Sequence, residues 1–256
     1  MNRKVIRRAG ALLFIFTLIL AFYSKASAEP NFPIPKLGMD LGPAESPQDV
    51  AVSLQILFLL TILSLAPAIL IMMTSFTRII IILSFLRNAL GTQQVPPNQV
   101  LIGLALFLTV FIMTPIGTQI NNQAIQPYLS EEITQDVALD RAVQPLREFM
   151  LNNTREKDLA LFVSLSGIEQ VDDKEDIPTK AVIPAFVISE LKTAFQFGFL
   201  IYIPFLVIDM VVASTLMSMG MMMLPPIMIS LPFKILLFIM IDGWNLVTQS
   251  IVMSFK

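Results

Sequence analysis

The sequence of 256 residues contains neither cysteine nor histidine. Without cysteine the chain cannot form disulfides or use a thiolate, and without histidine it lacks the usual general base and most zinc ligands. The phosphate-binding glycine pattern, the G-x-S-x-G elbow and the H-E-x-x-H zinc motif are absent from the sequence as well. We therefore predict that the protein is not an enzyme and uses no cofactor or metal.

Charge is also scarce, since charged residues make up 14% of the chain against about 25% in an average soluble domain. The formal net charge is −2, so nucleic acid is not an expected partner. Hydrophobic residues make up 55%, the mean hydropathy is +0.74, and the apolar residues fall in long runs. This composition predicts an integral membrane protein or a component buried in a large assembly.

Residues 1–28 have the three parts of a secretory signal peptide. Four basic residues precede a 13-residue apolar core, and the segment ends in Ala26-Ser27-Ala28, the small-x-small pattern that signal peptidase cleaves. We predict cleavage after Ala28; the alternative is an uncleaved anchor helix that starts near Val5. Residues 29–49 are rich in proline and are predicted to form an extended arm outside the membrane.

The rest of the chain predicts an all-α, membrane-associated protein with two long, kinked helical hairpins. The first hairpin covers residues 50–116 and turns at the sequence GTQQVPPNQ, and the second covers residues 182–256. Between them, residues 117–181 hold 12 acidic and six basic residues. Apolar residues recur there at helical spacing, so we expect a small, water-exposed insert with two short amphipathic helices.

Isolated charges interrupt the apolar runs, and a charge within hydrocarbon costs at least about 2.5 kcal/mol, so it usually pairs or faces a cavity. Asp209 and Lys234 lie on opposite arms of the second hairpin, 12–13 residues from a turn near Met221, and hence at similar depth. We expect them to pair within the chain or with a neighbouring subunit; the alternative is that each reaches an interface separately. Weaker candidates, because each lies near a segment end, are Arg78, Arg87, Glu190 and Asp242.

The two arginines also limit the first hairpin. Arg78 and Arg87 flank an apolar run of eight residues, which is too short to cross a membrane. The first arm therefore either leaves the membrane after Phe76 or continues as a rod packed against protein.

The turn of the second hairpin, STLMSMGMMMLPP (residues 214–226), holds five methionines and no charge. A turn exposed to water has no solubility reason to be so apolar. We therefore expect this turn to be buried in an assembly or to line a constriction, the alternative being simple packing between helices.

Three long stretches, in the same order, resemble the FliP family, the P subunits of the bacterial flagellar type III protein export gate; the R subunits of injectisomes have a similar pattern. The stretches are MMTSFTRIIIILSFLRNALGTQQVPPNQVLIGLALFLT (72–109), PAFVISELKTAFQFGF (184–199) and MSMGMMMLPPIMISLPFKILLFIMIDGW (217–244). The resemblance implies about five copies, assembled with Q and R subunits into a helical, cone-like complex around a pore. It further implies passage of unfolded flagellar proteins across the inner membrane, templating of the rod, an insert on the periplasmic side, and contacts with the B and A export subunits and rod proteins.

The resemblance also implies roles for individual residues. A pore gasket would consist of Met219, Met221, Met222 and Met223, with the loop shaped by Gly220, Pro225 and Pro226. Charge contacts within the hairpin or between subunits would involve Asp209, Lys234, Arg78, Arg87 and Glu190. The alternatives are an injectisome export-gate subunit, a scaffold that does not line the pore, or a small-molecule transporter, for which two unequal hairpins offer little support.

Overall fold

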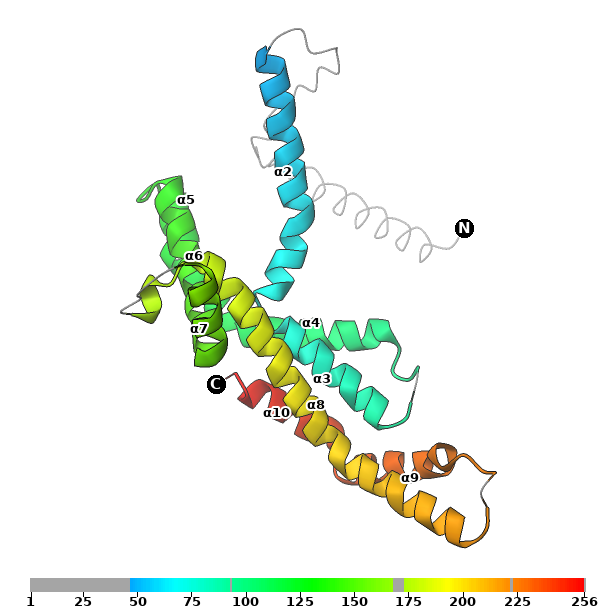
Figure 1. The fold of residues 1–256 in the computed structure, drawn as a ribbon. Coiled ribbons are helices and arrows are strands. Elements are labelled where there is room, and N and C mark those ends of the chain that lie inside the picture. The colour runs from blue at the N-terminus through cyan, green and yellow to red at the C-terminus, as the bar shows by residue number, and fades with distance from the viewer. Residues whose placement is uncertain (1–46, 93, 168–172, 222, 256) are drawn as a thin grey trace, which may run out of the picture. The chain divides into compact units, whose positions relative to one another are not determined.

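The computed structural model describes residues 47–92, 94–167, 173–221 and 223–255. The predicted signal peptide with Ala26 and Ala28, most of the proline-rich arm, and Met222 lie outside these ranges. The described residues form helices joined by turns and contain no β-strand, which confirms the all-α prediction (Figure 1). The chain divides after Leu54, and the second unit, Gln55–Lys256, contains most of the described structure.

The helices differ widely in length, from single turns to the 40 residues of α8. In chain order they are α2 (Pro47–Met72), α3 (Phe76–Ala89), α4 (Asn98–Ile120), η1 (Asn121–Ile125), α5 (Gln126–Leu129), α6 (Gln135–Asn153), α7 (Glu156–Leu165), η2 (Lys174–Asp176), α8 (Thr179–Ser218), α9 (Pro226–Met240) and α10 (Gly243–Met253). Within the residues that the structure describes, three helical stretches are long and apolar enough to cross a membrane: Ser53–Met72, Asn98–Leu129 and Thr179–Ser218. The pair α9 and α10, bent by 65°, gives a fourth if it is one span.

The first arm is interrupted by a turn at Met73–Ser75, between α2 and α3. None of the apolar stretch Ser53–Met72 is buried within the chain, whereas α3 buries a complete face. That face consists of Arg78, Ile79, Ile82, Leu83, Leu86 and Ala89. The segment with the two arginines is therefore a separate helix packed against protein, and not the continuation of α2 as one long rod.

The second arm of the first hairpin is longer than predicted. Helix α4 continues through the π-helical turn η1 into α5, so the helical path runs from Asn98 to Leu129 and passes the predicted boundary at Gly117. An exposed glycine within a helix costs only about 1 kcal/mol, which does not end a helix supported on both sides. The change in composition at this point therefore does not coincide with a change in backbone structure.

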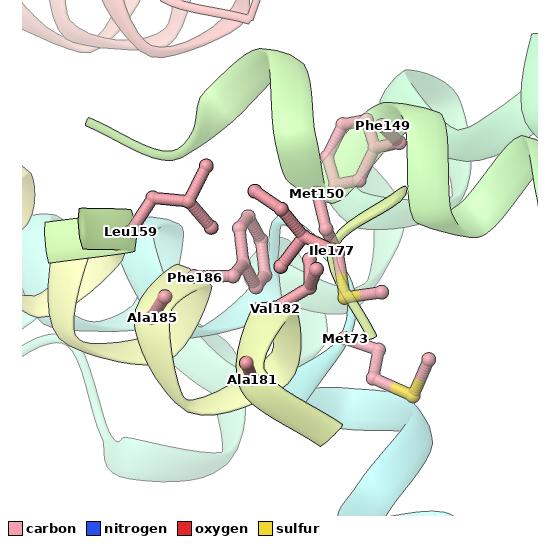
Figure 2. Close-up of a cluster of buried hydrophobic side chains, with 9 residues drawn as sticks. All are labelled: Met73, Phe149, Met150, Leu159, Ile177, Ala181, Val182, Ala185 and Phe186. Carbon is pink, nitrogen blue, oxygen red and sulfur yellow. The ribbon is translucent and has the colours of Figure 1, made fainter. Parts of the chain in front are cut away.

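The insert packs on the beginning of α8. Figure 2 shows Phe149 and Met150 of α6, Leu159 of α7 and Ile177 gathered around Phe186 of α8. At the surface of the insert, Lys174 Nζ donates a hydrogen bond to Glu156 Oε1 at 2.9 Å, and this contact lowers the pKa of the Glu156 carboxyl. The insert is therefore fixed to the second hairpin by a shared apolar core.

Helix α8 packs against α3, α6, α7 and α9. It is 40 residues long, and α3 lies along it with Phe85 pressed against Gly198. A Cβ atom at position 198 would lie 2.5 Å from Phe85 Cγ, so only glycine permits this approach of the two helices. Close packing here sets the distance between the first and second hairpins.

Candidate functional site

The methionine-rich turn lies between α8 and α9, and the structure describes the backbone at both of its ends. Helix α8 ends with the N–H of Gly220 bonded to the carbonyl of Met217 and the N–H of Met221 bonded to that of Leu216. Gly220 has a φ of +76°, the left-handed conformation that this type of helix end requires and that glycine adopts at least cost. Pro226 then opens α9 at a position where a missing N–H costs nothing.

The methionine side chains of this turn point away from the chain's own core. Met217, Met219, Met221 and Met223 are all exposed, and Met223 is 98% exposed. The sequence between Asp209 and Lys234 has no charged residue. The described part of the hairpin tip is therefore an uncharged surface whose methionine side chains are exposed.

The two arms of the hairpin are joined by a polar contact that we call the hairpin ion pair. Lys234 Nζ lies 2.6 Å from Asp209 Oδ2, and Ser230 Oγ donates to Asp209 Oδ1 at 2.5 Å. Lys234 is buried, and its ammonium also donates to the carbonyl of Ala89 at the end of α3, at 3.3 Å. One ammonium thus ties α8, α9 and α3 together within a single chain.

A second ion pair lies deeper in the protein. Arg78 of α3 forms two parallel hydrogen bonds with Glu190 of α8; Nε donates to Oε2 at 2.8 Å and Nη2 donates to Oε1. Both side chains are buried. This bidentate geometry is the strongest form of a carboxylate–guanidinium contact. Arg78 and Glu190 therefore join the first hairpin to the second.

The sequence did not predict this second pair. The two residues are 112 positions apart, so neither periodicity nor spacing connects them. The available signal was that each is an isolated charge of opposite sign in an apolar run. Arg87, by contrast, contacts uncharged groups, since its Nη1 donates to Asn98 Oδ1 at 2.6 Å and to the carbonyl of Pro96.

The hairpin ion pair gives a direct test. We expect Asp209→Asn to lower the amount of assembled complex by more than tenfold, because it leaves the buried ammonium of Lys234 without its partner. Lys234→Gln should lower it less, because the Asp209 side chain that it leaves unpaired is 35% exposed. The exchange Asp209→Lys with Lys234→Asp should restore part of it, but not all, because an aspartate at 234 would face the carbonyl of Ala89. Co-purification of the assembled complex measures this.

The control for this exchange is Lys180→Gln. Lys180 is exposed and lies at the start of α8, the helix that also carries Asp209, and its loss should leave assembly unchanged. If the double variant yields no more assembled complex than the single variants, Asp209 and Lys234 act through separate partners.

Sequence comparison identifies the family. The profile described as the FliP family matches residues 59–251, which include the methionine-rich turn and both ion pairs. The chain belongs to the FliP family. A FliP relative from Bacillus subtilis (strain 168) is 58% identical over 212 residues, which cover 83% of this chain and 96% of the relative. A FliP relative from Caulobacter vibrioides is 47% identical over 251 residues, which cover 98% of this chain and 92% of the relative.

A third FliP relative, from Pectobacterium carotovorum, is 56% identical over 208 residues and 81% of each chain. All three relatives have the name flagellar biosynthetic protein FliP. Membership of the FliP family gives this chain a role in flagellar biosynthesis and protein export, as a structural component of the export apparatus rather than an enzyme. Its long apolar helices make it a membrane protein.

Proposed function

We propose that this chain is a pore-forming subunit of the flagellar export gate in the bacterial inner membrane. In this proposal about five copies and the Q and R subunits wind into a helical cone that conducts unfolded flagellar proteins and templates the rod. The B and A export subunits and rod proteins are its further partners. The insert faces the periplasm, and residues 1–28 are removed as a signal peptide after targeting.

The observation that carries this proposal is the uncovered methionine-rich turn. Methionine is unbranched and polarizable, so it fills irregular gaps and adapts to changing neighbours. Met219, Met221 and Met223 are exposed at the tip of a hairpin whose arms are held by the hairpin ion pair. Several such tips around one axis would supply an apolar ring on a fixed base.

The chemistry of such a ring suits a seal. A hydrophobic constriction blocks ions by excluding water from the narrowest part of a pore. Flexible thioether side chains move aside for an unfolded polypeptide of any sequence, whereas branched side chains rearrange less. We infer that Met219, Met221, Met222 and Met223 form this seal.

The proposal differs from the scaffold alternative in what the turn touches. A photo-crosslinking residue at Met223 should attach to a flagellar protein stalled in transit, because the 98% exposed side chain would line the route. The matched position is Leu165 in the insert, which is 71% exposed but outside the predicted seal and should give no such product. Immunoblotting of the stalled complexes measures both.

A complex that assembles normally and stalls substrate, yet gives no product from position 223, would contradict the pore-lining role. The chain would then be a scaffold beside the route. A product of equal yield from positions 223 and 165 would show that the stalled protein contacts the chain without a defined path.

A further inference from the structure

The segment that follows α10 is held by the same arginine that pairs with Glu190. Arg78 Nη1 donates to the carbonyl and to the hydroxyl of Ser254, both at 2.9 Å. The Arg78 guanidinium carbon also lies 3.7 Å from the centre of the Phe255 ring. A buried guanidinium that is shared between a carboxylate, a backbone carbonyl and an aromatic face has few alternative positions. Ser254 and Phe255 are therefore fixed on α3.

Phe255 also contacts the insert. Its ring stacks on Phe149 of α6, with ring centres 6.0 Å apart and planes 19° apart. Phe255 packs against both the core cluster of the insert and the cluster around α3. We call Arg78, Phe149, Ser254 and Phe255 the clasp. It is the place where the first hairpin, the insert and the end of the second hairpin meet.

The clasp lies at the far end of the arm that begins at the methionine-rich turn. That arm bends by 65° between α9 and α10. At the bend, Asp242 has a left-handed backbone with a φ of +51°, and a Cβ atom on Gly243 would lie 2.2 Å from the Phe238 ring. A corner packed this tightly resists a change in the angle between its two helices, so a movement of α10 also moves α9.

The arm is thus held at two points that differ in burial. Near the turn, the hairpin ion pair includes Asp209, whose side chain is 35% exposed. At the far end, the clasp is attached to a fully buried guanidinium–carboxylate pair. We propose that Ser254 and Phe255 are positioning residues, which fix the returning arm through the clasp and thereby hold the methionine-rich turn in its closed position. The effect on the turn rests on the proposed function; the clasp itself does not.

The clasp is tested by cysteine labelling, because the chain has no cysteine of its own. Ile251→Cys places a thiol in the last turn of α10, where the side chain is fully buried, and it should react slowly with a maleimide. Adding Phe255→Ala should speed labelling by about tenfold or more, since local opening exposes the site. Met253→Cys, at an exposed position, should react quickly in both backgrounds.

Two further variants show whether fast labelling comes from loss of the clasp or from general unfolding of the protein. Phe255→Tyr retains the ring that stacks on Phe149 and lies beside Arg78, so labelling of Ile251→Cys should stay slow. Ser254→Ala removes the hydroxyl but keeps the carbonyl, the other Ser254 acceptor of the Arg78 guanidinium, so it should speed labelling less than Phe255→Ala. Labelling of the complete gate in native membranes that is equally slow with and without the Phe255 ring would overturn the clasp.

The coupling to the turn has its own readout. Phe255→Ala should raise the ion leak through idle gates while the assembled complex is still present. Phe255→Tyr, which keeps the ring, should leak no more than the unchanged protein. If methionine-turn variants leak but Phe255→Ala does not, while its labelling is fast, the clasp exists and the coupling is wrong. If neither variant leaks, the proposed seal fails instead, and the labelling result still decides whether the clasp is present.

Discussion

Replacing Met219, Met221 and Met223 with alanine is expected to make membranes that contain idle export gates leak ions, while export of flagellar proteins is partly retained. Each substitution shortens an exposed side chain at the hairpin tip, so the apolar constriction widens and fills with water. We expect the ion conductance of the reconstituted complex to rise by about tenfold or more, since water-filled pores conduct and dewetted ones do not. Planar bilayer recordings, or a membrane-potential dye in cells, measure this.

The matched control is Met240→Ala. Met240 is 75% exposed and lies on the same arm, at the end of α9 rather than at the turn. Its loss should leave conductance unchanged. A triple variant that assembles in normal amounts and conducts no more than this control contradicts the seal.

Neutralising one member of the Arg78–Glu190 pair should have the largest effect on stability. Arg78→Ala or Glu190→Ala leaves a buried charge without its partner, which typically costs about 3–5 kcal/mol. Removing Arg78 also releases Ser254 and Phe255. We expect neither variant to accumulate as folded protein, as measured by its amount in membranes and by thermal unfolding in detergent.

Removing both charges together should be less harmful than removing either one, because no buried charge is then left alone. The control is Glu156→Gln on the insert, where the carboxylate pairs with Lys174 at the surface and water screens the contact. Since the pKa of Glu156 is lowered, whatever stability this contact gives is present above the carboxyl's ordinary pKa and is lost as the pH falls. If Glu190→Ala is as stable as Glu156→Gln, the buried pair does not hold the hairpins together.

Local sequence features were enough to predict the second hairpin. The glycine and paired prolines around the methionines set a turn, and counting from that turn placed Asp209 and Lys234 at one level. In the structure these two side chains contact each other, with Ser230 as a third member. Turns and depths along a hairpin follow from chain geometry alone, which is why they are readable from one sequence.

The contacts between segments were not predictable in the same way. The bend at Asp242 depends on one left-handed residue and on Phe238 lying against Gly243, and neither changes the apolar pattern. The clasp joins Arg78 to Phe255 across 177 positions. Such contacts arise from tertiary packing, which overrides local preference and leaves no period in the sequence.

The length of α8 has a consequence for where the protein sits. Forty residues at 1.5 Å each make a helix of about 60 Å, twice the ~30 Å thickness of the hydrocarbon layer. Glu190 and Asp209 lie nineteen positions apart on this helix, which corresponds to ~29 Å, and Lys192 is the one charged residue in the sequence between them. The Arg78–Glu190 pair and the hairpin ion pair are therefore spaced along α8 by about one bilayer thickness, and the whole helix is about twice as long as a perpendicular span requires.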